Sequence, residues 1–138
     1  MTRTVLILST LMTLSLSGMA QDMSYIYRTG GILNGRAWSE WSHDVKLGYI
    51  TGYQEHWEAA YDTLDERSEF GREVFAVPLL TIPEIVHGLD AFYAEPTNAR
   101  INIRVALRIL SAKATGASGA EVQEMTDQAR RDAMKPDK

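Results

Sequence analysis

The chain contains no cysteine among its 138 residues. This excludes disulfides, thiolate metal sites, thiol nucleophiles and a lipoprotein anchor attached through an acylated cysteine. An excess of basic residues is also missing, because 14 Lys and Arg face 18 Asp and Glu. Proteins that bind a nucleic-acid backbone need a basic face, so we expect no nucleic-acid partner.

The familiar catalytic patterns are missing as well. There is no Gly-x-Ser-x-Gly nucleophile elbow, and the glycines have neither phosphate-loop nor dinucleotide-binding spacing. None of His43, His56 and His87 lies four residues from another histidine, the spacing of a helical zinc site. The sequence therefore predicts a protein that is not an enzyme, without catalytic residues, metal or cofactor.

Long apolar runs are confined to the N-terminus. Arg3 precedes an apolar stretch over residues 5–16, and Gly18 and Ala20 are small residues suited to cleavage before Gln21. A dozen apolar residues are too few to span a bilayer of about 30 Å, but they fit an export signal. We expect a signal peptide over 1–20, a periplasmic or secreted protein, and no membrane segment after cleavage. Removal of Arg3 makes the net charge −5.

The remaining residues predict one small all-α domain of about four helices, preceded by an irregular N-terminal arm. The arm covers 21–41, is rich in tyrosine and tryptophan, and includes a turn at Asn34-Gly35. The helical domain covers 42–134, and a frayed tail covers 135–138. Residues 68–80 are expected to form a loop, with Phe75 and Val77 tucked inward.

Four helices follow from periodicity and end signals. The first is capped by Ser42 and runs to near residue 68. The second begins at a capping box of Thr81 and Glu84 and ends before Pro96. The third starts near 101 or 103 and ends before Gly116. The fourth starts at a second capping box, Ser118 with Glu121, and runs to about 134.

Two glycines lie inside the first helix, although each costs about 1 kcal/mol relative to alanine there. Gly48 and Gly52 are one turn apart. We interpret them as a groove of small residues where a second helix crosses. Such a groove would serve packing within the chain and packing in a homodimer equally well.

Asp90 lies at the edge of the apolar stripe of the second helix, so it is expected to be partly buried. Burial raises the pKa of a carboxyl group unless a cation pairs with it. The row Arg100, Arg104 and Arg108 is predicted to supply that cation in a structural ion pair. A hydrolase centred on Asp90 with His87 or Glu84 is the catalytic alternative.

Tyrosine and tryptophan favour interfaces, because an apolar ring carries a polar tip. The aromatic arm, the small-residue groove and the segment 93–103 are therefore candidate binding regions, although the arm could instead fold over the helices. A metal site at His56, with Glu55, Asp62 and Glu66, is a further alternative. The candidate binding residues are Trp38, Trp41, Gly48, Gly52, Tyr53, His56, Asp90, Tyr93 and Asn98.

Two segments, 47–53 and 81–110, resemble small exported helical proteins of uncharacterised role. More distantly, they resemble immunity proteins that neutralise amidase effectors of type VI secretion. The resemblance implies a periplasmic all-helical protein, often dimeric, that plugs the cleft of its cognate enzyme. It lies in packing motifs and implies no particular inhibitory residue. The motif residues are Trp38, Lys46, Tyr49, Gly52, Asp90, Phe92, Tyr93, Asn98, Ile101, Ala106 and Leu107.

We therefore expect a non-catalytic protein-binding module, of which an immunity-type inhibitor of a cell-envelope enzyme is one form. An acidic chain of this kind would meet a basic protein partner. The alternative is a periplasmic protein that binds a small ligand or a metal in the groove of Gly48 and Gly52 with His56.

Overall fold

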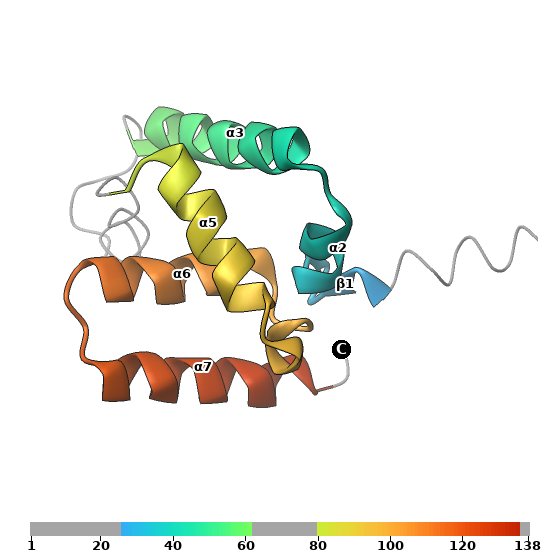
Figure 1. Ribbon diagram of the computed structural model, residues 1–138, viewed down its shortest axis with the longest axis vertical. Coiled ribbons are helices and arrows are strands. Elements are labelled where there is room, and N and C mark those ends of the chain that lie inside the picture. Colours follow the sequence, from blue (N-terminus) through green and yellow to red (C-terminus); the bar gives the residue numbers. More distant parts are fainter. Residues whose placement is uncertain (1–25, 62–79, 136–138) are drawn as a thin grey trace, which may run out of the picture.

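The computed structural model describes residues 26–61 and 80–135 (Figure 1). This part of the chain contains five α-helices, one short 3-10 helix and two two-residue strands, which confirms the all-α fold. The elements are β1 (Arg28–Thr29), β2 (Ile32–Leu33), α2 (Gly35–Glu40), α3 (His43–Tyr61), α5 (Ile82–Tyr93), η2 (Pro96–Asn98), α6 (Ile103–Ala114) and α7 (Gly119–Ala133).

The four longest helices form a stack in the order α3, α5, α6, α7. Helix α5 packs against α3 on one side and α6 on the other, and α6 packs against α7 (Figure 1). The hairpin and α2 lie beside this stack, where α2 contacts α5. One hydrophobic core joins these elements, so burial of apolar surface is the main stabilising contribution. Its fully buried large side chains include Trp38, Ile50, Ile85, Leu89, Ile101, Ile103 and Leu107.

The predicted ends of α5, α6 and α7 are confirmed. The Thr81 and Ser118 N–H groups each donate to a carboxylate three residues ahead, that of Glu84 or Glu121, at 2.7 Å. Gly116 ends α6 with a φ of 93°, a left-handed conformation that favours glycine. Local end signals therefore fixed the start of two helices without help from tertiary packing.

The expectation of an irregular arm is wrong for residues 28–40. Gly30 and Gly31 have φ of 59° and 74°, and this turn joins β1 to β2 with Arg28 opposite Leu33. The Asn34-Gly35 pair is no simple turn, because Asn34 caps α2: its Oδ1 accepts a hydrogen bond from the Arg36 N–H at 3.0 Å. Asparagine is favoured at this position because it satisfies an otherwise unpaired helix N–H.

Several expectations concern residues outside the described ranges. These are the signal peptide over 1–20, the first part of the arm, the extension of the first helix beyond residue 61, and the loop with Phe75 and Val77. Among the residues described, no helix is both long and apolar enough to cross a membrane.

Candidate binding surface

The carboxylate of Asp90 on α5 binds side chains from both α2 and α3, where these three helices meet. Asp90 Oδ1 accepts a hydrogen bond from Trp38 Nε1 at 2.8 Å and forms an ion pair with Lys46 Nζ at 2.7 Å. The Lys46 ammonium also lies 5.4 Å from the centroid of the Trp38 ring, within range of a cation–π interaction. Asp90 thus connects three helices through two side chains that are 44 and 52 residues away in sequence.

The predicted cation for Asp90 is therefore wrong, although the predicted structural ion pair exists. Lys46 on α3 takes the place that the arginine row of α6 was expected to fill. The reason lies in the order of packing: α5 presents opposite sides to α3 and α6, and Asp90 lies on the α3 side. No local spacing marks Lys46, so this pairing could be found only in three dimensions.

The environment of Asp90 favours its charged form. Burial alone would raise the pKa of Asp90, but the hydrogen bonds from Lys46 and Trp38 and the positive charge of Lys46 lower it below its usual value. A general base working near neutral pH needs the opposite shift. The junction therefore has the electrostatics of a structural contact.

Aromatic rings surround this contact. The Trp38 ring lies 5.9 Å from that of Trp41 and 6.5 Å from that of Tyr93, and the Trp41 ring lies 5.0 Å from that of Tyr49. Trp38 is only 1% exposed, whereas Trp41 is half-buried. The arm thus folds over the helices, and Trp38 is a core residue instead of a contact for a partner.

Two other candidate residues, Tyr93 and Asn98, are also structural. Tyr93 is buried, its hydroxyl donates to the Ile101 carbonyl at 3.1 Å, and burial raises its pKa. Asn98 is 4% exposed, its Nδ2 donates to the Phe92 carbonyl, and its Oδ1 accepts from Arg130 Nε at 2.9 Å. The proposal of a binding surface over 93–103 is therefore wrong for these two side chains.

Among the described residues, no second helix crosses α3 at Gly48 and Gly52, so the predicted packing there within the chain is not seen. Both glycines are exposed, and no described atom lies within 4 Å of the position that a Cβ would take. The face of α3 that packs on α5 is the opposite one, centred on the fully buried Ile50. A helix places residues three and four apart on one side, and this spacing puts the glycines away from Ile50.

The exposed side of α3 has a distinct composition. We define the outer face of α3 as Asp44, Val45, Gly48, Gly52 and Glu55, all of them exposed. Val45 is 50% exposed, which is unusual for a branched apolar side chain. Neither Asp44 nor Glu55 forms a hydrogen bond or ion pair with another described residue. Val45 and Asp44 were not among the residues predicted to bind, although four-residue steps link Asp44 to both glycines.

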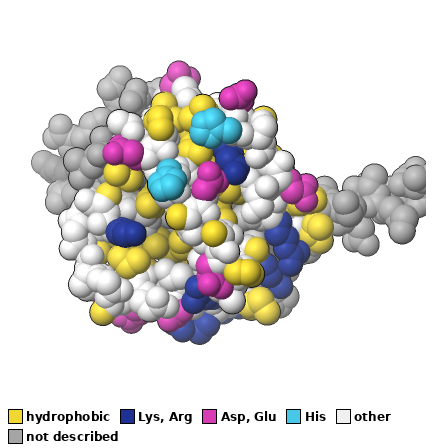
Figure 2. All heavy atoms as spheres, viewed as in Figure 1, with side chains coloured by type: hydrophobic (Ala, Val, Ile, Leu, Met, Phe, Trp, Pro, Cys, Tyr) yellow, Lys and Arg dark blue, Asp and Glu magenta, His cyan; other side chains and the backbone are white. Residues whose placement is uncertain are grey.

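The remaining candidates, Tyr53 and His56, also lie on α3. Tyr53 is half-buried against the core, and His56 is exposed. No group of three or more His, Asp and Glu side chains that could hold a metal occurs within the described ranges, and Asp62 and Glu66 of the predicted metal site lie outside them. Figure 2 shows two histidines beside acidic and basic side chains over α3 and α5, with the charges of both signs intermixed.

Comparisons with protein-family models, curated proteins and solved structures give no match.

Proposed function

We propose that this protein is an exported, non-catalytic binding module whose outer face of α3 packs against a basic segment of a partner protein. The observation that carries the proposal is that Gly48 and Gly52 lie between two carboxylates, Asp44 and Glu55, and that no described residue covers the glycines or pairs with the carboxylates. Each glycine lowers the stability of the helix by about 1 kcal/mol relative to alanine. No contact among the described residues offsets that loss.

Close approach of a partner's backbone is the physical reason to keep glycine on an exposed helix surface. With no Cβ at two successive turns, another segment can lie directly on the α3 backbone. Val45, at the same surface, would lose its exposed apolar area to such a segment. Val45, Gly48 and Gly52 together therefore favour a surface that packs against another chain over one that carries out a chemical reaction.

The chemistry of the partner follows from charge. Asp44 and Glu55 flank the glycines, and neither has a cation of its own among the described residues. Lysine or arginine side chains on the partner would pair with them, which raises the association rate and sets the orientation more than it raises affinity. The net charge of −5 that remains after removal of residues 1–20 favours the same kind of partner.

The cellular setting of the proposal depends on the N-terminal segment. Arg3, the short apolar run and the small residues before Gln21 support export to the periplasm or beyond. An inhibitor of a cell-envelope enzyme, of the immunity type, is the specific form that the sequence resemblance supports. The junction at Asp90 would then hold α3 rigidly, as a helix that blocks a cleft requires.

Reversal of the two carboxylates tests this proposal. The wild-type chain, expressed and processed by its own host and captured from the envelope fraction, should give a complex with a second protein in native mass spectrometry. Asp44→Lys combined with Glu55→Lys should lose that complex while the helical circular dichroism is unchanged. Ala120→Lys with Gln123→Lys is the control, since it adds basic charge on exposed positions of α7.

Two results would contradict the proposal. One is recovery of the same complex at the same yield with the reversed carboxylates. The other is a wild-type chain that carries no protein partner. The mass of the chain in the same spectra shows whether residues 1–20 have been removed. Export is tested separately, since recovery of the uncleaved chain from the cytoplasm would contradict it.

A further inference from the structure

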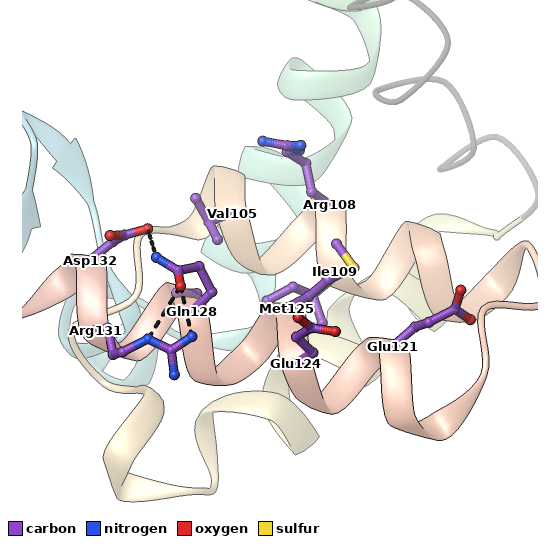
Figure 3. A pocket seen from close by; sticks show the side chains of 10 residues that line it. Val105, Arg108, Ile109, Glu121, Glu124, Met125, Gln128, Arg131 and Asp132 are labelled. Carbon is purple, nitrogen blue, oxygen red and sulfur yellow. Dashed lines mark hydrogen bonds between the residues drawn. The ribbon is translucent and has the colours of Figure 1, made fainter.

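A groove of about 580 Å³ lies between α6 and α7 (Figure 3). Apolar side chains from both helices form its floor, and charged side chains form its edges, as Figure 3 shows. The floor is made of Val105, Ile109, Met125 and Ala129, and the edges of Arg108, Glu121, Glu124, Gln128, Arg131 and Asp132. An apolar floor with a polar rim is the general anatomy of a protein interface.

The edge contributed by α7 is polarised along the helix. Glu121 and Glu124 lie toward its N-terminal end, Gln128 lies midway, and Arg131 and Asp132 lie toward its C-terminal end (Figure 3). These positions are three or four residues apart or multiples of that spacing, so they share one side of the helix. The N-terminal half of this edge is therefore negative, and the positive charge of Arg131 lies in the C-terminal half.

Neither Glu124 nor Arg131 forms an ion pair with another described residue. Glu124 forms no hydrogen bond or ion pair with another described residue. The Arg131 guanidinium donates from Nε and Nη2 to the uncharged Gln128 Oε1, at 3.2 and 2.7 Å. Asp132, by contrast, is compensated by Lys135 at 2.6 Å and accepts a bond from Gln128.

From this pattern we infer that the groove is a homodimer interface, in which α7 of a second copy lies antiparallel on α7 about a two-fold axis near Gln128. Such an axis relates position 124 of one copy to position 131 of the other. Each Glu124 then meets Arg131 of the second copy, and the pair occurs twice because the interface is isologous. Met125 and Val105 are half-buried in the single chain and would be covered by the second copy.

Charge favours a second copy over an unrelated segment. A basic segment in the groove would meet Arg108 and Arg131, and an acidic segment would meet Glu121, Glu124 and Asp132. A segment matches both ends of the groove when its own negative and positive charges run in the opposite direction to those of α7. A second copy of α7, placed antiparallel, meets this condition. Figure 1 shows α3 and α7 at opposite ends of the helix stack, so this dimer goes beyond the proposed function and is compatible with it.

Sedimentation equilibrium of the chain as processed by its host, over a range of concentrations, tests the dimer. The interface is small, so we expect a dissociation constant in the micromolar range or weaker, and weaker still at high salt. Glu124→Arg and Arg131→Glu should each weaken the dimer at least about tenfold, because each change replaces two attractive pairs by two repulsive ones. The combined variant Glu124→Arg with Arg131→Glu should restore it.

Gln123→Arg is the matched control, since it adds charge on α7 outside the groove and should leave the dimer intact. Circular dichroism on each variant separates loss of association from loss of fold. A wild-type chain that is monomeric at every concentration overturns the inference. So does a dimer that tolerates Glu124→Arg, or a combined variant that stays as weak as the single ones. None of these results depends on capture of a partner through α3.

Discussion

Two pairs of glycines in this protein occupy opposite environments. At Gly35 a Cβ would collide with the ring of Tyr93, and at Gly88 it would lie 2.7 Å from Leu110 Cδ1. At Gly48 and Gly52 it would meet no described atom within 4 Å. The first pair lets α2 and α6 approach α5 closely. The second pair has no such use within the described fold, which is why we assign it to an interface with another molecule.

The largest effect is expected at the closed junction. Trp38→Ala removes a fully buried ring and the N–H that holds Asp90, so we expect a loss of about 3–5 kcal/mol in the free energy of unfolding. Urea denaturation followed by circular dichroism measures this loss. Trp41→Ala, at a half-buried ring, should cost clearly less. Equal losses at the two tryptophans would show that the junction is not centred on Trp38.

Substitution of the enclosed glycines should destabilise the protein by a smaller amount. Gly35→Ala forces the buried Tyr93 ring to move, and overpacking of this kind costs about 1–3 kcal/mol. Gly88→Ala should cost less, because it meets the ends of the Leu110 side chain, which can rotate. Thermal unfolding of both variants checks the order. A Gly35→Ala variant as stable as the wild type would contradict the close packing of α2 on α5.

The open glycines should behave in the opposite way. Gly48→Ala and Gly52→Ala each remove backbone entropy from the unfolded chain without a clash, so each should stabilise the protein by about 1 kcal/mol. The same denaturation measurement applies. Destabilisation at either position would mean that the outer face of α3 is covered within the chain.

The smallest effect concerns pH. Folding lowers the pKa of Asp90 below its value of 3.8 in an unfolded chain, so folding favours the ionised form. The resulting stability is fully present above the unfolded pKa and is lost as pH falls through the lower folded pKa. The difference in stability between wild type and Asp90→Asn should therefore shrink below about pH 4. A difference that is constant from pH 7 to pH 2 would show that the charge of Asp90 contributes nothing.

The sequence predicted the local features of this fold well. The capping residues Thr81 and Ser118 and the stop at Gly116 depend only on neighbouring residues, and all three lie where they were expected. The hairpin and α2 were missed because their segments are short. Their stability comes from contacts distant in sequence, such as the Gly35 N–H to the Ile101 carbonyl at 3.3 Å.

The candidate site was harder to predict for the same physical reason. Periodicity shows that residues share a helix face, but not which face meets a neighbour or solvent. Gly48 and Gly52 were correctly recognised as costly in a helix, yet they face away from α5. The partner of Asp90 was assigned to the next helix in sequence, whereas Lys46 comes from the preceding one. Neither the direction that the glycines face nor the partner of Asp90 is indicated by residues close to them in sequence.

The most direct test of the central claim measures stability and partner capture in one variant. Gly48→Gln combined with Gly52→Gln introduces better helix formers and also blocks close approach to α3. We predict a more stable protein that no longer captures its partner from the envelope fraction, while the control Ala120→Gln captures it normally. A variant that is more stable and captures the partner as well as the wild type would contradict the claim that the outer face of α3 is a binding surface.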